Sequence, residues 1–394
     1  MSNWRELEAK YLMHTYNRQP VVLVSGQGCR VRDEEGRNYL DLVAGIAVNC
    51  LGHAHPAIAS AVQAQVQTLI HTSNLYYTIP QIELAQLLVD NSCGDRAFFC
   101  NSGAEANEGA IKLARKWGKL HRNGAFGIIS AQGSFHGRTL AAVAATGQAK
   151  FQKPFLPMPD GFGHVPFNDL EAVRQATTDQ TIGILLEPVQ GESGVHPAHQ
   201  EYLQGVRAWC DENGLLLIFD EIQTGLGRTG KLFGYQHFDV EPDIFTLAKG
   251  TAGGLPIGVL LAKQHACVFE PGDHASTFGG SPLVCAAAVA TLRTILDQNL
   301  AAHAARVGDY FRGKLRGLRA RLPLVKDVRG LGLMIGVDLA RDVARQAVSL
   351  ALADGLIINA TGEHTLRMVP PLILSEAEVD EAMEILERVL ALCD

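Results

Sequence analysis

The chain alternates short apolar runs with longer amphipathic segments, and this alternation limits the folds that it can adopt. The apolar runs have the length of buried strands, and they are RAFFC at 96–100, FGIIS at 126–130, TIGILLEP at 181–188, GLLLIFD at 214–220 and DIFTLAK at 243–249. Helical patterns lie between them, including EANEGAIKLARKWGKL at 105–120 and QEYLQGVRAWCDENG at 200–214. Strands that alternate with helices form a mostly parallel sheet covered by helices. The centre of the chain is therefore expected to form one large α/β domain.

The two ends of the chain have different patterns. The stretch CRVRDEEGRNYLDLVAG at 29–45 has strand patterns on both sides of a charged turn, which predicts a hairpin. After residue 292, a long helical pattern precedes two strand patterns, GLGLMIGVDL and LRMVPPLIL. We therefore expect residues 1–50 to begin a small domain, residues 51–292 to form the large domain, and residues 293–394 to complete the small one.

Composition and charge narrow the class of partner. The 394 residues are 47% apolar and 19% charged, and a formal net charge of -7 comes without any basic block that would attract nucleic acid or an anionic membrane. No apolar run reaches the ~20 residues needed to cross a bilayer, and the first residues lack the pattern of a secretory signal. We expect a cytoplasmic protein that binds small molecules.

Cysteine and histidine spacing gives no sign of a metal site. Eight cysteines are scattered without a C-x-x-C pair, which is typical of reduced thiols and not of a disulfide framework or zinc site. His53 and His55 in LGHAHP are the nearest approach to a ligand pair, but they lie just before Pro56 and have no third ligand. No metal is expected.

The stretch LIFDEIQTGLGRTGK, which begins at Leu217, contains a G-x-G-x-x-G pattern and comes close to a Walker A motif. A dinucleotide fingerprint needs its glycines directly between a strand and a helix, but several residues intervene here and KLFGYQH is a poor helix start. A Walker loop needs a hydroxyl where Leu232 stands. The glycines therefore predict a turn-rich loop, while a nucleotide-binding NTPase or dehydrogenase remains the alternative from a different class.

Three features at the ends of strands point to one kind of chemistry. Asp220 and Lys249 each end an apolar run, and ligands bind at the carboxyl ends of parallel strands. A third run leads into NSGAEANE, where Ser102 and Glu105 have the spacing of a capping box. This segment either only caps the helix or, with Gly103, presents free amides that can bind an anion. A partly desolvated lysine is a nucleophile toward carbonyl groups. These are the parts of a pyridoxal phosphate site, in which lysine forms the Schiff base, the acid keeps the pyridine nitrogen protonated and the helix holds the phosphate.

The motifs as a set resemble those of a known family. Six of them occur in the order and spacing of the class III aminotransferases of pyridoxal phosphate fold type I: NSGAEANE, SFHGRT, EPVQGE, FDEIQTGLGRTG, TLAKG and STFGG. The resemblance covers nearly the whole chain. It implies a large domain with a mostly parallel seven-stranded sheet, a small α+β domain built from both chain ends, and a homodimer with shared active sites.

The resemblance also assigns roles in cofactor binding. Lys249 would be the Schiff-base lysine and proton carrier, and Asp220 the partner of the pyridine nitrogen. The other cofactor contacts would be Ser102, Gly103 and Ala104 around the phosphate, Phe135 stacked on the ring, Gln223 at the ring hydroxyl, and Thr277 reaching the phosphate from the other subunit. Taken singly, Phe135 could instead be part of the core, and His136 beside it a hydrogen-bonded loop residue.

Substrate contacts follow from the same resemblance. Arg138 would hold a substrate carboxylate, Glu192 and Arg367 would form a second, switchable carboxylate site, and Ser276 would also line the substrate site. Either arginine alone could equally be a surface ion pair. Two positions depart from the family pattern, in which Gly is usual at Ser193 and Asn at Ser281. Both departures concern fine specificity and not the chemistry.

Within the family, GIAVNCLGHAHP and HTSNLY are more similar to the acetylornithine aminotransferases than to the ornithine or 4-aminobutyrate enzymes. The activity implied is transfer of the δ-amino group of N-acetylornithine to 2-oxoglutarate. The products would be N-acetylglutamate 5-semialdehyde and glutamate, with net flux in the opposite direction during arginine synthesis. Succinylornithine, ornithine, succinyldiaminopimelate and 4-aminobutyrate remain alternative amino donors on the same fold.

Overall fold

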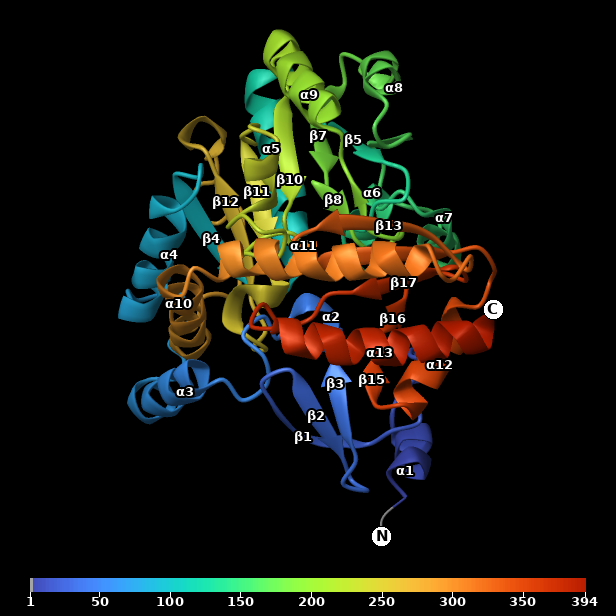
Figure 1. Cartoon of the computed structure of the whole chain (residues 1–394). Helices are drawn as coiled ribbons and strands as arrows, with labels where there is room; N and C mark the ends of the chain where they lie inside the picture. The colour runs from blue at the N-terminus through green and yellow to red at the C-terminus, as the bar shows by residue number, and fades with distance from the viewer. Residues whose placement is uncertain (1–2) are drawn as a thin grey trace.

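A seven-stranded sheet forms the centre of the molecule (Figure 1). The computed structural model describes residues 3–394. The strand order is β4-β12-β11-β10-β7-β5-β6. The strands are β4 (Arg96–Cys100), β5 (Gly127–Ala131), β6 (Phe162–Val165), β7 (Thr181–Leu186), β10 (Leu216–Asp220), β11 (Ile244–Leu247) and β12 (Gly258–Ala262). Only β12 runs antiparallel to its neighbours β11 and β4, so the expected mostly parallel seven-stranded sheet is confirmed.

Helices cover both faces of this sheet. In β10, Leu216 and Ile218 pack with residues of α5 (Gly103–His121), whereas Leu217 and Phe219 pack with residues of α9 (Gln200–Asn213). Successive side chains of a strand point to opposite faces, so a strand buried on both faces is apolar throughout. This double burial explains why the predicted strands are unbroken apolar runs, and both predicted helices are present.

The remaining helices and short strands of the large unit surround the sheet. They are α2 (Ala44–Ala47), α3 (Pro56–Thr68), α4 (Ile79–Asp90), α6 (Leu140–Ala145), α7 (Ala149–Gln152), α8 (Leu170–Ala176), α10 (Pro282–Asp297), and the strand pair β8 (Val189–Gln190) and β9 (His196–Pro197). A short 3-10 turn, η3 (Lys249–Ala252), follows β11. Within residues 3–394, no helix is both long and apolar enough to span a bilayer.

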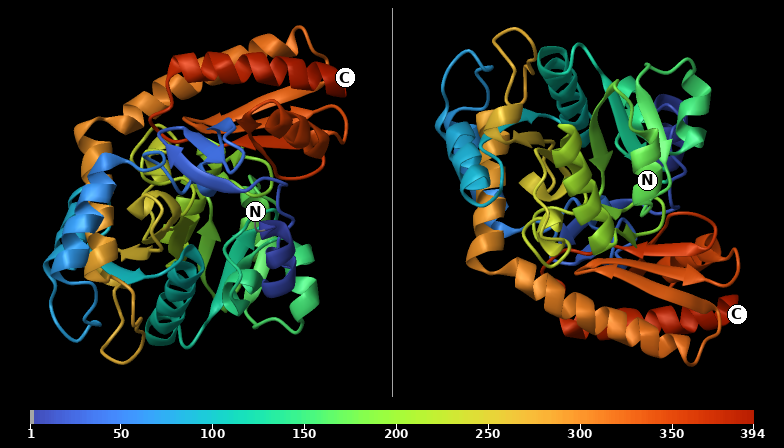
Figure 2. Two further views of the ribbon diagram at one scale, coloured as in Figure 1. Left: turned by 90° about the horizontal axis from the view of Figure 1, so that it is seen from below. Right: turned by 90° about the horizontal axis from the view of Figure 1, so that it is seen from above.

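A second sheet lies under the C-terminal helices. Its strand order is β13-β14-β17-β16. The elements of this unit are α11 (Leu300–Arg319), β13 (Val325–Leu331), β14 (Met334–Leu339), α12 (Ala344–Ala353), β16 (Asn359–Ala360), β17 (Thr365–Met368) and α13 (Glu376–Cys393). Figure 2 shows α11 and α13 side by side along one edge of the molecule. The run LRMVPPLIL was expected to be a strand, but β17 ends at Met368 because Pro370 and Pro371 have no N–H for a ladder.

The two chain ends meet in a third sheet, β1-β2-β3-β15. Its strands are β1 (Leu23–Gln27), β2 (Arg30–Asp33), β3 (Asn38–Asp41) and β15 (Leu356–Ile357), and α1 (Trp4–Tyr11) precedes them. The predicted hairpin is present, since β2 and β3 are antiparallel, and β15 from the C-terminal segment adds parallel to β3. The division into residues 1–50, 51–292 and 293–394 remains a proposal, and α10 runs through its second boundary.

The glycine-rich loop after β10 does not lead directly into an α-helix but packs against the C-terminal unit. Buried Arg228 donates to the carbonyl of Leu333 at 3.0 Å and also to that of Pro370. A Cβ on Gly230 would lie 2.9 Å from that of Ala305 on α11. The glycines therefore permit close packing between two units, as a turn-rich loop does, and the nucleotide-binding alternative has no structural basis.

Gly308 on α11 offers a test of this packing. A Cβ there would lie 2.0 Å from the backbone oxygen of Gly332, whereas one on Gly313 of the same helix would meet open space. Gly308→Ala should lower the free energy of unfolding by about 1–3 kcal/mol through overpacking. Gly313→Ala should raise it by roughly 0.5–1 kcal/mol, because Ala favours helix more than Gly does. Denaturant unfolding compares them, and similar shifts in both variants would contradict the close contact.

Candidate active site

A cavity of about 410 Å³ opens at the carboxyl ends of the large sheet's strands, a volume suited to a small ligand. It brings together most of the residues predicted from the sequence. Its lining includes Ser102, Gly103 and Ala104 after β4, Phe135, His136 and Arg138 after β5, Glu187 after β7, Glu192 after β8, Asp220 and Gln223 at the end of β10, and Lys249 after β11. The predicted convergence of strand ends is therefore present in the structure.

The start of α5 presents two free amides to this cavity. Ser102 is the N-cap, and its Oγ accepts the N–H of Glu105 at 3.2 Å. The Glu105 carboxylate turns back and accepts the N–H of Asn101 at 3.0 Å. The amides of Gly103 and Ala104 have no partner within the helix, because the first turn lacks preceding carbonyls. A Cβ on Gly103 would lie 2.7 Å from Ile222, so glycine keeps this helix start close to β10. These amides and the helix dipole form a site for a phosphate.

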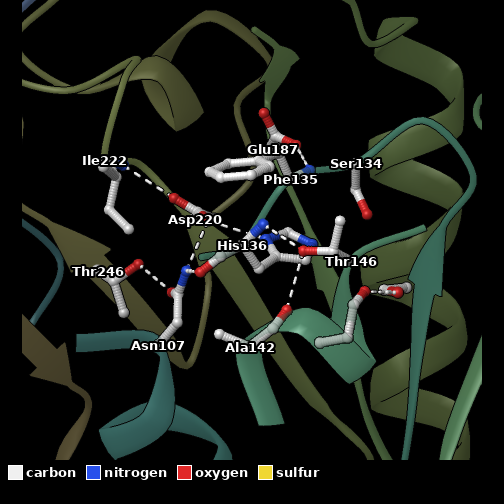
Figure 3. A network of polar contacts seen from close by, with 12 residues as sticks. Asn107, Ser134, Phe135, His136, Ala142, Thr146, Glu187, Asp220, Ile222 and Thr246 are labelled. Carbon is white, nitrogen blue, oxygen red and sulfur yellow. Dashed lines mark hydrogen bonds and ion pairs between the residues drawn. The ribbon is translucent and has the colours of Figure 1, made fainter. Parts of the chain in front are cut away.

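Asp220 is held by a buried network of polar groups (Figure 3). Its Oδ2 accepts from Asn107 Nδ2 at 2.8 Å and lies 2.8 Å from His136 Nδ1, while its Oδ1 accepts the N–H of Ile222 at 3.0 Å. Asn107 is itself oriented by Thr246, whose Oγ1 donates to Asn107 Oδ1 at 2.8 Å. A carboxylate fixed in this way keeps one orientation, as required of an acid that faces a nearby protonated nitrogen.

Glu221, the neighbouring acid, has a structural role. It is buried, and its carboxylate accepts the N–H groups of Gly234 at 2.8 Å and Tyr235 at 2.6 Å, together with the hydroxyl of Thr224. Burial raises its pKa to about 7, although these donors oppose the rise. The structure therefore separates the two acids, because Asp220 lines the cavity and Glu221 ties down the next loop.

Lys249 lies in the cavity wall at the start of η3. Burial lowers the pKa of its ammonium, and the neighbouring Glu192 carboxylate opposes that shift. A lower pKa increases the fraction of neutral amine, which is the form that attacks a carbonyl group. The lysine predicted as the nucleophile thus has the surroundings that such a role needs.

Phe135 and Arg138 follow β5 on the same loop. The Phe135 ring packs edge-on against Phe151, with ring centroids 5.5 Å apart. The Arg138 guanidinium lies 4.2 Å from the centroid of Phe151, and among residues 3–394 it forms no ion pair. An exposed guanidinium held by an aromatic face at a cavity wall is available to a carboxylate ligand.

Glu187 is a site residue to which the sequence analysis gave no role. It ends the apolar run of β7, and its carboxylate accepts the N–H of Phe135 at 2.8 Å and that of Gly191 at 3.0 Å. Burial raises its pKa to about 7, a shift that the nearby His136 opposes and Asp220 increases. Its position at a strand end, like that of Asp220, was the signal that could have identified it.

Glu192, which lines the cavity, forms an ion pair with Arg367, which is buried behind it and does not itself line the cavity. Arg367 is 1% exposed, and its Nη1 lies 2.6 Å from Glu192 Oε1. The same guanidinium donates to the Gly191 carbonyl at 3.2 Å and to Asn359 Oδ1 at 2.9 Å. Burial would raise the pKa of Glu192, but the charges of Arg367 and Lys249 outweigh it and lower that pKa to about 2. The pair predicted from the sequence is present, with Gln223 3.3 Å from Glu192 Oε1.

Thr277 and Ser276 do not line the cavity of their own chain. Ser276 Oγ accepts from Asn101 Nδ2 at 3.1 Å and from the N–H of Gly279 at 3.0 Å, which fixes the loop. Thr277 is exposed beside it. The roles given to both residues remain predictions, and the expected location of Thr277 in another subunit's site agrees with its exposure here.

The residues at the cavity fit pyridoxal phosphate. A phosphate would meet the free amides at the start of α5, a pyridine nitrogen would meet Asp220, an aldehyde would meet Lys249, and Phe135 provides an aromatic face. In contrast, no group of three or more His, Cys, Asp or Glu side chains in residues 3–394 is arranged to hold a metal ion. His53 pairs instead with Asp41 Oδ2 at 2.8 Å, and His55 caps α3.

Comparison with known proteins agrees with this geometry. The family model described as "Aminotransferase class-III" matches residues 11–390. The chain belongs to the class III aminotransferases. It is 54% identical over 385 residues to the acetylornithine aminotransferase of Caldanaerobacter subterraneus subsp. tengcongensis, with 98% of each chain covered. As this family requires, the enzyme is a transaminase that depends on pyridoxal phosphate.

Solved structures of other class III aminotransferases share the fold. The N-acetylornithine aminotransferase of Stenotrophomonas maltophilia K279a is 37% identical, with a TM-score of 0.85 over 98% of both chains. The ornithine aminotransferase of Toxoplasma gondii ME49 is 32% identical, with a TM-score of 0.95 over 99% of this chain and 94% of that one. The fold predicted from the motifs is thus confirmed for this aminotransferase.

The two neighbouring acids should respond differently to neutral substitution. Asp220→Asn keeps the shape and should still fold, but it removes the charge facing the cavity, so kcat should fall by about 10²-fold or more. Glu221→Gln should mainly reduce stability, by about 1–3 kcal/mol, because the NH₂ group of glutamine cannot accept the hydrogen bonds that Glu221 now accepts from Gly234, Tyr235 and Thr224. Steady-state kinetics and thermal unfolding separate the two effects. If Glu221→Gln caused the larger loss of kcat at unchanged stability, the roles of the two acids would be reversed.

Proposed function

We propose that this aminotransferase moves the δ-amino group of N-acetylornithine to 2-oxoglutarate, giving N-acetylglutamate 5-semialdehyde and glutamate, and that it serves arginine biosynthesis in the reverse direction. The similarity to the Caldanaerobacter and Stenotrophomonas acetylornithine enzymes supports this choice. The observation that carries it is the pairing of buried Arg367 with Glu192 beside Lys249. Cytoplasmic location remains part of the proposal and agrees with eight free thiols.

The two amino donors make different demands on one cavity. Glutamate carries a carboxylate on the carbon that bears its reacting amine, whereas the δ-amine of N-acetylornithine has no charge near it. Breaking a buried ion pair costs about 3–5 kcal/mol, because one charge is left without a partner. Glu192 neutralises Arg367 while N-acetylornithine is bound, and it moves aside when the glutamate carboxylate takes its place. Arg138, which forms no ion pair among residues 3–394, holds the distal carboxylate of either donor by its planar fork.

Each residue of the cavity then has one role in the reaction. Bound pyridoxal phosphate supplies an electron sink for the carbon that loses a proton. Lys249 carries that proton, since its lowered pKa allows the amine to accept it and then return it. Asp220, fixed by Asn107 and His136, holds a negative charge beside the ring nitrogen. The amides of Gly103 and Ala104 would hold the phosphate, Phe135 would cover a ring face, and Gln223 would contact the ring hydroxyl; all four residues line the cavity.

We further propose a homodimer in which Thr277 reaches the phosphate of the opposite site. The loop that carries Thr277 lies beside a set of exposed apolar side chains, since Asn74 donates to the carbonyls of Ser276 and Gly279 at 2.9 Å. This apolar set consists of Leu75, Tyr76, Tyr77, Ile79 and Phe278, which are between 65% and 97% exposed. Large exposed apolar patches mark interfaces between proteins.

The amino donor is tested by single-turnover reactions. The purified enzyme, loaded with cofactor, is mixed with N-acetylornithine, N-succinylornithine, ornithine, succinyldiaminopimelate or 4-aminobutyrate, and the change in cofactor absorbance is followed. We expect the highest rate constant per donor concentration with N-acetylornithine. A higher value with any other donor overturns the assignment of substrate while leaving the aminotransferase chemistry in place.

Substitutions of the two substrate residues should affect the half-reactions differently. Glu192→Ala should slow the N-acetylornithine half-reaction by about 10-fold or more, because Arg367 is left unpaired, and should spare or speed the glutamate half-reaction. Arg138→Ala should slow both, because both donors carry a distal carboxylate. The same absorbance change measures each half-reaction separately. Equal effects of Glu192→Ala on both donors would end the switch hypothesis.

Shared sites predict complementation between inactive variants. Lys249→Ala removes the nucleophile, and Thr277→Asp places a carboxylate against the phosphate of the other subunit. A hybrid dimer then has one intact site and one doubly damaged site, so an equal mixture should recover about a quarter of wild-type activity after subunit exchange. Different affinity tags on the two variants allow the hybrid dimer to be isolated and verified. Activity no greater than the sum of the two parent proteins would show that each site is complete within one chain.

A further inference from the structure

Four residues form a row across the C-terminal sheet. Arg329 on β13 pairs with Gly336 on β14, Gly336 pairs with Arg367 on β17, and Arg367 pairs with Asn359 on β16. Paired residues on neighbouring strands point to the same face of a sheet. The two arginines therefore stand on the same face, with a residue that has no side chain between them.

The switch loop, residues 191–197, fills the space above that glycine. A Cβ on Gly336 would lie 2.8 Å from the Gly194 carbonyl oxygen and 3.0 Å from the Cβ of Val195. On one side of the loop, Arg367 binds the Gly191 carbonyl and the Glu192 carboxylate. The loop that carries the switch glutamate is thus seated between Arg367 and Arg329.

Arg329 holds the other side of the switch loop. Its Nε donates to the carbonyl of Val195 at 2.9 Å and, at 3.1 Å, to that of Gly194, which also accepts from Nη2 at 2.7 Å. The guanidinium is oriented by Asp338, with Nη1 2.6 Å from Oδ2 and Nη2 2.8 Å from Oδ1. Asp338 Oδ1 also accepts the hydroxyl of Thr365 at 2.7 Å, two residues before Arg367 on β17. One network therefore joins the loop to the strand that carries Arg367.

The backbone of the switch loop needs such support. Val195 has a φ of 60°, and Gly194 has a φ of 126°. A β-branched residue in the left-handed region is strained and persists only where its surroundings hold it. Val195 is fully buried against Met334, Val369 and Val189, and its carbonyl is one of those that Arg329 binds.

We propose that Arg329 is a positioning residue for substrate choice: by fixing the backbone at Gly194 and Val195, it returns the Glu192 carboxylate to Arg367 after each glutamate half-reaction. This inference rests on the proposed switch function. Glu192 then moves by side-chain rotation alone, because its loop stays fixed on the sheet. Without the Arg329 contacts to the Gly194 and Val195 carbonyls, the Glu192–Arg367 pair is weaker and the enzyme is biased toward the state that accepts glutamate.

The test compares Arg329→Lys with Arg321→Lys in the full-length, cofactor-loaded protein. Lysine keeps the charge but loses the planar fork that binds two carbonyls and a carboxylate together. Arg321 is a matched control, because it forms a two-pronged pair with Glu387 at 3.0 and 2.9 Å on the exposed surface, away from the switch loop. The measured quantity is the ratio of kcat/KM for N-acetylornithine to that for glutamate. We expect Arg329→Lys to lower this ratio about fivefold or more and Arg321→Lys to leave it unchanged.

Two further variants make the outcome decisive. In a Glu192→Ala background, Arg329→Lys should cause no further change in the ratio, because no carboxylate is left to position. Asp338→Asn, which loosens the guanidinium without removing it, should lower the ratio in the same direction and decides the matter if Arg329→Lys does not fold. Hydrogen exchange of the peptide spanning residues 190–197 should be faster in Arg329→Lys than in Arg321→Lys.

The possible failures are distinguishable. An equal loss of both half-reactions in Arg329→Lys, or a ratio change that persists in the Glu192→Ala background, overturns the positioning role alone. An unchanged ratio in Glu192→Ala itself overturns the switch, and with it this inference. A ratio that falls in Arg329→Lys and Asp338→Asn but not in Arg321→Lys supports the proposal.

Discussion

The buried guanidinium of Arg367 is the constraint around which the cavity is arranged. At 1% exposure it cannot be stabilised by water, so a negative group must face it at every stage of the reaction. Glu192 supplies that group in the structure, at 2.6 Å. The strong depression of the Glu192 pKa to about 2 shows that the pair stays charged throughout the physiological pH range. Substrate carboxylates therefore compete with a carboxylate of the protein, and not with water.

The large sheet determines where the other groups lie. Its strands are buried on both faces, so polar side chains gather at the strand ends, and those at the carboxyl ends form the cavity. Asp220, Lys249, Glu187 and the start of α5 all occupy such ends. The C-terminal sheet then places Arg367 behind Glu192, which lines the cavity. The chemistry thus depends on a contact between two sheets whose sequences are far apart.

Much of this arrangement could be predicted from local patterns. Apolar runs revealed β4, β5, β7, β10 and β11, and charged residues at their ends identified Asp220 and Lys249. The predicted runs did not include β6 or β12. The antiparallel direction of β12 could not be predicted from its apolar sequence, because strand direction depends on pairing and not on composition. The roles of Glu187 and Arg329 were also missed, since each acts through backbone groups that only the folded chain brings near. The assignment of Thr277 depended wholly on the resemblance, because within residues 3–394 its hydroxyl makes no hydrogen bond that would indicate a role.

The absence of a side chain at Gly336 has a consequence for how selectivity can evolve. This position does not line the cavity, yet even a methyl group there would collide with the Gly194 carbonyl and displace the loop that carries Glu192. A substitution at Gly336 would therefore alter the preference between the two amino donors without changing any residue that lines the cavity. Engineering that varies only the residues lining the cavity would change the shape of the pocket. It would leave Gly336 unchanged, although this residue helps to set the position of the loop that carries Glu192.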